Sequence, residues 1–155
     1  MKRLAAQLMA KVSALTPDTL WGEIALILTD HPGMIEIHEA CMGKSHTTDV
    51  LTLRYDPVPG ETSSEVNVEL IINVQRAMDM GQQSCPGRKT RVPWGECREF
   101  ALYIAHGCDH LTGADDGDRH GRERMRKREL RWLSEAHDSG LVEGLLHAGP
   151  VGTDP

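Results

Sequence analysis

The stretch His106-Gly-Cys-Asp-His110, which follows the apolar run 100–105, constrains the fold more than any other part of the chain. Histidines four residues apart lie one turn apart on the same face of a helix. Gly113 follows, a residue type at which helices commonly end, and Asp116 comes six residues after the second histidine. Two helical histidines and a ligand from the next turn make an open three-ligand zinc site. The pattern therefore predicts a metal-bearing helix over 94–111.

The same stretch departs from the metallopeptidase motif His-Glu-x-x-His, in which the glutamate is the general base. Gly107 occupies the glutamate position here. The motif thus favours metal-assisted hydrolysis over ordinary proteolysis. A His-x-x-x-His pair also arises by chance, but the apolar helix before it and the turn after Gly113 favour a metal site.

Composition narrows the class of protein. The 155 residues suit one domain, and the net charge of -6 excludes a uniformly basic nucleic-acid binder, so RNA affinity must come from a local patch or from the metal. Four cysteines without a Cys-x-x-Cys pair are typical of a reducing compartment. Because no segment reaches about 20 apolar residues, we expect a cytoplasmic protein with no membrane partner.

Hydrophobic periodicity predicts helices and strands intermixed in one α+β domain, with a small mixed sheet and about four to five helices. Helices are expected over 2–15, from Asp30 to Gly43, from 75 to 80, over 94–111 and over 118–137, and strands over 21–29, 49–55 and 66–74. Segment 81–93 is expected to be a loop. The domain is expected to span 1–137, and the Gly- and Pro-rich segment 138–155 to form a flexible tail.

Two motifs resemble those of the YbeY family, the bacterial endoribonucleases and rRNA maturation factors. The family signature His-Gly-x-x-His-Leu-x-Gly-Tyr-Asp-His is similar to the chain from His106 to Asp116. The family signature Gly-Lys-Asp-x-Pro-Thr-Asp-Val-Leu-Ser-Phe is similar to the chain from Gly43 to Leu53. The resemblance covers about 21–137, with its elements in the same order, and it implies a zincin-like metal helix.

The resemblance implies a single-strand-specific, zinc-dependent endoribonuclease that acts in rRNA maturation and ribosome quality control. Its partners would be precursor rRNA and the small ribosomal subunit, and not DNA. One Zn²⁺ per chain would be held by His106, His110 and Asp116. Lys44, Thr48 and Asp49 would bind the substrate, although they could equally form a turn that bonds its own backbone. Two alternatives stay open: a zinc-binding ribosome-biogenesis factor with weakened catalysis, and a peptidase-like metallohydrolase.

Several positions differ from the family pattern. Asp116 stands where most members have a histidine, and His120 is a competing third ligand. Met42 stands where the family has an arginine that acts on RNA. Family members begin with a strand before the first helix, so an edge strand is missing here or the true start lies upstream.

Other roles rest on single residues. No general base is obvious, and Asp115 and Glu99 are the candidates. Asp109 is either a partner that orients an imidazole or a tolerated surface change. The basic helix with Arg122 and Arg126, together with loop 87–91, would contact RNA, unless the helix is merely a solvated face.

Overall fold

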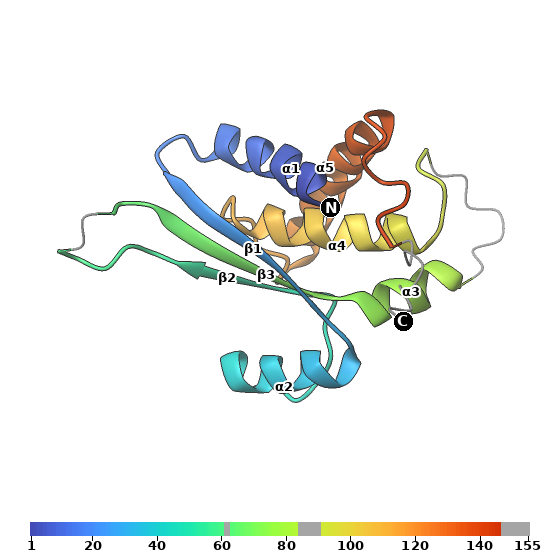
Figure 1. The fold of residues 1–155 in the computed structure, drawn as a ribbon, viewed down its shortest axis with the longest axis horizontal. Coiled ribbons are helices and arrows are strands. Elements are labelled where there is room, and N and C mark those ends of the chain that lie inside the picture. Colours follow the sequence, from blue (N-terminus) through green and yellow to red (C-terminus); the bar gives the residue numbers. More distant parts are fainter. Residues whose placement is uncertain (61–62, 84–90, 147–155) are drawn as a thin grey trace, which may run out of the picture.

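The computed structural model describes residues 1–60, 63–83 and 91–146. In this part of the chain, five helices and three strands follow one another in a mixed order (Figure 1). They are α1 (Lys2–Leu15), β1 (Trp21–Thr29), α2 (His31–Met42), β2 (Val50–Tyr55), β3 (Val66–Asn73), α3 (Val74–Gln82), α4 (Glu96–His110) and α5 (Arg119–Asp138). The predicted α+β class is therefore confirmed.

The sheet has the strand order β1-β3-β2 and is mixed. β1 runs parallel to β3, with Leu26 opposite Leu70, whereas β2 runs antiparallel to β3, with Thr52 also opposite Leu70. The central strand β3 contains an apolar run from Leu70 to Ile72, and Leu70 and Ile72 have no exposed surface. Such an apolar run is typical of a strand that is covered on both faces.

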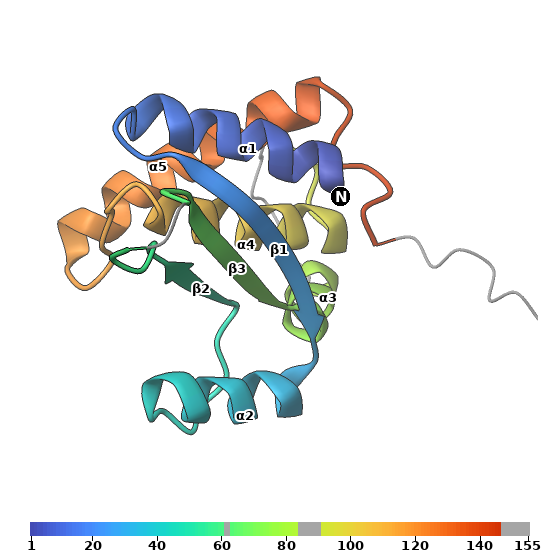
Figure 2. The same ribbon diagram turned by 60° about the vertical axis from the view of Figure 1, so that its left-hand side comes forward.

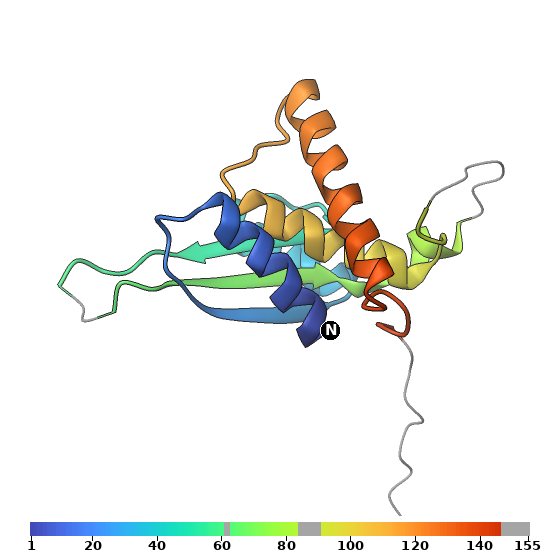
Figure 3. The same cartoon turned by 90° about the horizontal axis from the view of Figure 1, so that it is seen from above.

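Helices cover both faces of this sheet. α1, α4 and α5 lie on one side and α2 on the other, and α3 continues from the end of β3 (Figures 1 and 2). From above, α1 and α5 are seen to lie over α4, which lies directly on the strands (Figure 3). The larger core joins α1, α4, α5 and the sheet, whereas Met34, Leu51 and Ile71 form a smaller cluster under α2.

Local sequence signals set the ends of the helices. Asp30 caps α2 by accepting a hydrogen bond from Gly33 N (2.9 Å), and Gly43 ends that helix with a φ of 67°. Asn73 and Asp118 cap α3 and α5 in the same way. The predicted bounds agree with these elements to within two residues, and α3 extends to Gln82, into the segment predicted as a loop.

The chain remains packed beyond the predicted domain end. Val142 is 3% exposed and belongs to the larger core, and Leu141 and Leu145 pack against it. The last part of the expected tail, residues 147–155, lies outside the described residues. No helix in the described ranges is long and apolar enough to cross a bilayer.

Candidate metal centre and its cleft

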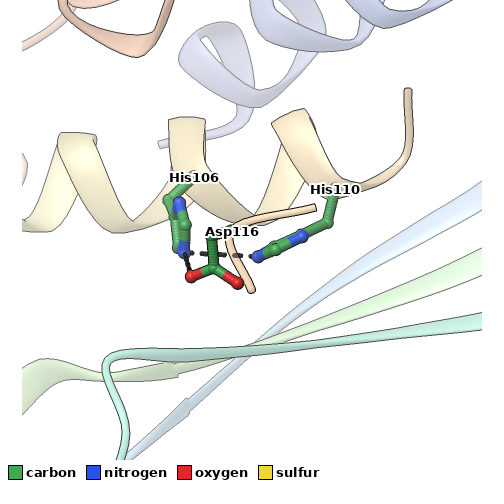
Figure 4. A group of neighbouring side chains, drawn as sticks. All are labelled: His106, His110 and Asp116. Carbon is green, nitrogen blue, oxygen red and sulfur yellow. Dashed lines mark hydrogen bonds and ion pairs between the residues drawn. The ribbon is translucent and has the colours of Figure 1, made fainter. Parts of the chain in front are cut away.

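Three side chains converge where α4 ends. His106 and His110 lie one turn apart, with their Nε2 atoms 3.2 Å from each other, and Asp116 Oδ2 lies 3.8 Å from His106 Nε2 (Figure 4). One donor atom from each residue lies within 4.8 Å of the other two, so the three residues form a group that could hold a metal ion. His120 is exposed at the start of α5 and is not a member of this group.

The second nitrogen of each imidazole faces an acceptor. His106 Nδ1 lies 2.6 Å from Glu129 Oε1, and His110 Nδ1 lies 3.1 Å from the carbonyl oxygen of Ala114. Because a carbonyl and a carboxylate only accept, each Nδ1 must donate its proton. In the neutral rings this leaves two Nε2 lone pairs facing each other at 3.2 Å, an arrangement that a bound cation stabilises. The donor set therefore fits a metal ion.

Protons compete with a metal for the same atoms. Burial lowers the pKa of His106, but the hydrogen bond and charge of Glu129, together with the charges of Asp49 and Asp116, outweigh it and raise the pKa above its usual value. A more basic imidazole is also a better metal ligand once it is deprotonated. The Glu129 carboxylate thus favours binding of either a proton or a metal ion at His106.

The turn that carries Asp116 is held from α5. Gly113 adopts a φ of 80°, which reverses the chain after α4. Arg122 Nη1 then donates to the carbonyl oxygens of Asp116 (2.8 Å) and Gly117 (3.2 Å). Asp118 accepts a hydrogen bond from Gly121 N (2.6 Å) and so starts α5 directly after the turn. These bonds place the Asp116 carboxylate opposite the two imidazoles.

Glu129 is only 3% exposed and is not among the site residues predicted from the sequence. A signal was present, because Glu129 lies on the apolar stripe of α5, one turn after Met125 and one turn before Leu133, both of which are buried. A carboxylate in the apolar stripe of an otherwise strongly basic helix needs a buried partner. That partner is His106.

Asp109 fits neither role that the sequence left open. Its side chain is fully buried, and its carboxylate pairs with Arg128 of α5 (2.5 Å) and not with an imidazole. Burial raises the pKa of Asp109, although the Arg128 guanidinium opposes this rise. Asp109 therefore ties α4 to α5 next to the metal group.

A cleft of about 410 Å³ opens beside His106 and Asp116. Its charged and polar lining also includes Asp49, Arg76, Glu99, Tyr103, Arg122, Arg126 and Glu129. These side chains come from α3, α4, α5 and the residue before β2. The cleft thus brings cations and carboxylates from four parts of the chain next to the metal group.

The candidate substrate residues occupy different surroundings. Asp49 lines the cleft, and its Oδ1 accepts hydrogen bonds from Val50 N (2.9 Å) and Thr48 Oγ1 (3.1 Å). Asp49 thus lies in a turn bonded to its own backbone and also forms part of the cleft wall, and substrate binding by this segment stays a prediction. Lys44 is exposed and does not line the cleft.

The two candidate general bases, Glu99 and Asp115, lie in different places. Glu99 lines the cleft but is buried in an ion pair with Arg98. Asp115 is exposed, accepts a hydrogen bond from Gly117 N (3.1 Å), and lines another hollow with Arg124 and Arg128.

Two further positions from the sequence analysis lie apart from the cleft. Met42 is 55% exposed and lines a hollow on the β2 side of His110. In the predicted RNA-binding loop, residues 87–90 lie outside the described residues, and Arg91 pairs with Asp138 of α5 (2.6 Å).

Comparison with known proteins gives one family. The model of the family described as endoribonuclease YbeY matches residues 1–137. The endoribonuclease YbeY of Salinibacter ruber is 28% identical over 115 residues, which cover 72% of this chain and 68% of that protein. The protein of the same name from Syntrophomonas wolfei is 27% identical over 133 residues, which cover 81% of this chain and 78% of that protein. The one from Desulfitobacterium hafniense is 27% identical over 143 residues, which cover 85% of this chain and 83% of that protein.

Proposed function

This chain belongs to the YbeY family, and from that premise we propose that it is a single-strand-specific, zinc-dependent endoribonuclease acting in rRNA maturation and ribosome quality control. Precursor rRNA is its substrate, the small ribosomal subunit its partner, and the cytoplasm its place of action. The observation that carries the proposal is the convergence of His106, His110 and Asp116 beside an open cleft. When bound there, zinc would acidify a water molecule and polarise a phosphate oxygen.

The residues around the metal group have separate roles in this proposal. Glu129 and the Ala114 carbonyl hold the two imidazoles in the tautomer that presents Nε2. Arg122 holds the Asp116 turn. The charge of Asp49 acts on His106, and both hydrogen bonds that the Asp49 side chain accepts within the described chain end on Oδ1. We therefore assign to Asp49 Oδ2 the role of proton acceptor for the attacking water.

Glu99 is a weaker candidate for that role. It lies two turns before His106 on α4, about 10 Å along the helix axis. Its carboxylate also pairs with Arg98. Asp115 faces a different hollow.

A matched pair of variants tests the metal assignment. Asp116→Ala should lower zinc affinity and RNA cleavage strongly, whereas His120→Ala should leave both near wild type, because His120 lies outside the ligand group. Metal analysis after native purification should give about one zinc per chain for the wild type. A wild type without bound transition metal, or a larger loss in His120→Ala, would overturn this assignment.

A second candidate function is a zinc-binding ribosome-biogenesis factor with weakened catalysis. It is favoured by Met42, which stands where the family resemblance places an arginine. Cleavage of single-stranded RNA by wild type and by Met42→Arg separates the two functions. Comparable rates support the endoribonuclease, whereas activity in the variant alone supports the weakened factor.

The peptidase alternative is disfavoured by packing at Gly107. A Cβ at this position would meet side-chain atoms of Val50, Leu70 and Thr52 at 3.0–3.2 Å. Position 107 therefore faces the sheet and not the cleft. A glutamate there would enter the core and could not act on a substrate at the metal.

A further inference from the structure

Three arginines line the cleft beside the metal group. They are Arg76 from α3 and Arg122 and Arg126 from α5. Arg122 donates to two carbonyls of the ligand turn, and Arg126 lies 3.8 Å from the Glu129 carboxylate. Both α5 arginines thus contact residues that lie next to His106. No ion pair within the described residues involves Arg76.

The backbone of Arg76 has a fixed position. Asn73, the last residue of β3, caps α3 by accepting a hydrogen bond from Arg76 N (3.0 Å). At the other end of α3, a Cβ on Gly81 would lie 2.3 Å from Glu96 N, so α3 packs closely against the start of α4. The central strand and α4 therefore set where the Arg76 side chain begins.

Two carboxylates act on Tyr103 together with Arg76, and neither forms an ion pair with Arg76 within the described residues. Arg76 lies beside the buried Tyr103, whose pKa is raised to about 12 by burial and by the charges of Glu99 and Asp49, while the charge of Arg76 and its hydrogen bond with the Tyr103 hydroxyl oppose the rise. Glu99 is held by Arg98, and Asp49 is hydrogen-bonded by the chain around it. Arg76 itself is half-buried. Its guanidinium has lost part of its hydration without gaining a carboxylate partner.

We propose that Arg76 binds a non-bridging phosphate oxygen of the RNA strand that lies over the metal group. This inference rests on the proposed endoribonuclease function and adds a substrate contact on the α3 wall. The planar guanidinium offers paired N–H donors that match two phosphate oxygens. Hydrogen bonds to the anion compensate the Arg76 guanidinium for the water contacts that it has lost. The strand is then held between the metal group and α3.

The test uses three variants of the full chain. Arg76→Gln removes the charge, Arg76→Lys keeps the charge without the fork of donors, and Arg3→Gln, on the exposed side of α1, changes the net charge equally at a distance. Binding of a single-stranded 2′-O-methyl RNA oligonucleotide is measured by fluorescence anisotropy at several salt concentrations. Zinc content and thermal unfolding are measured in parallel, and cleavage of ordinary single-stranded RNA is measured separately.

Arg76→Gln should raise Kd about tenfold or more and reduce the slope of log K against log salt by about 0.7, the value for one lost phosphate contact with a single strand. Arg76→Lys should keep the slope but lose affinity, and Arg3→Gln should behave as wild type. Zinc content should be the same in all variants.

Three results would overturn different parts of the proposal. Unchanged affinity and slope in Arg76→Gln, with a binding wild type, overturns the Arg76 contact alone. A wild type that binds but does not cleave overturns the endoribonuclease activity, while the binding comparison still decides the contact. A wild type that does not bind overturns both.

Discussion

The position of one proton on each imidazole depends on residues outside the metal group. His106 receives its orientation from Glu129, 23 residues further along the chain, and His110 from the carbonyl of Ala114. The Glu129 carboxylate can be replaced by mutation, whereas the Ala114 acceptor is a backbone carbonyl and cannot. Glu129 is therefore the residue at which the orientation of the metal group can be tested.

Glu129→Gln should lower zinc affinity about 10- to 100-fold, because a neutral amide holds the His106 imidazole less firmly and makes it less basic. Glu123→Gln is the matched control, since Glu123 lies on the same helix and pairs with Arg119 at the surface. Competition with a zinc chelator measures both affinities. Equal affinities in the two variants would show that Glu129 has only a packing role.

Tyr103 gives a pH prediction at the same scale. Its pKa is raised from 10.0 to about 12, mainly by burial. A group with a raised pKa in the folded state stabilises the fold below its unfolded pKa and loses that effect as the pH passes the folded pKa. Stability should thus fall by about 3 kcal/mol in total as the pH rises from well below 10 to well above 12, at 1.36 kcal/mol per pKa unit.

Absorbance at 295 nm follows the phenolate directly, and urea unfolding at several alkaline pH values follows the stability. Tyr103→Phe should remove the later ionisation step and flatten the stability curve in this window. Tyr55→Phe is the control, because Tyr55 is exposed, and it should leave the later step in place. Ionisation of Tyr103 near pH 10 would contradict its burial.

At the scale of elements, two glycines let α4 approach its neighbours. Gly107 lies on the sheet, where an added Cβ would meet flexible side-chain atoms at 3.0–3.2 Å. Gly81 of α3 lies on the start of α4, where an added Cβ would meet backbone atoms of Gly95 and Glu96 at 2.3–2.6 Å. Side chains can shift by a few tenths of an ångström, whereas backbone contacts require the two helices to separate.

Gly81→Ala should therefore destabilise the protein more than Gly107→Ala. For Gly107→Ala we expect about 1–3 kcal/mol, the usual range for an overpacked core, reduced by the higher helix propensity of alanine. Chemical denaturation of both variants gives the order. A Gly81→Ala variant as stable as wild type would show that α3 does not pack on α4 in this way.

At Gly81 the structure differs from the expectation drawn from the sequence. The sequence predicts a helix over 75–80 and a loop over 81–93, whereas α3 extends to Gln82. Gly81 is needed for the close approach of α3 and α4, a contact between segments that periodicity does not record. The other elements were predictable because their signals are local, such as the Asp30 cap and the Gly43 end.

The candidate site likewise contains residues that the sequence predicts and contacts that it does not. His106, His110 and Asp116 lie within eleven residues of sequence, so their spacing predicts that they meet, while it leaves His120 as a competing third ligand. The pairs His106–Glu129 and Asp109–Arg128 join α4 to α5 across a turn whose path the sequence does not define. Arg76 comes to the cleft from α3, which no motif links to the metal helix.

At the scale of the whole molecule, the net charge of -6 opposes RNA at long range, while the arginines of the cleft attract it at contact. Long-range repulsion slows association, whereas local contacts mainly set the rate of dissociation. The two effects can be separated because acidic residues lie far from the cleft. Glu36 and Glu39 are exposed on α2, on the opposite face of the sheet from α4 (Figure 2).

The double variant Glu36→Gln, Glu39→Gln should bind single-stranded RNA with an association rate several-fold higher at low salt, because it removes two negative charges without touching the cleft. Its dissociation rate should equal that of wild type, and the advantage should vanish near 1 M salt, where the Debye length is about 3 Å. Arg126→Gln should instead raise the dissociation rate, because Arg126 lines the cleft. Stopped-flow association and dissociation rates for the three proteins decide between these effects. A change in the dissociation rate of the α2 variant would place RNA on the α2 face and away from the metal group.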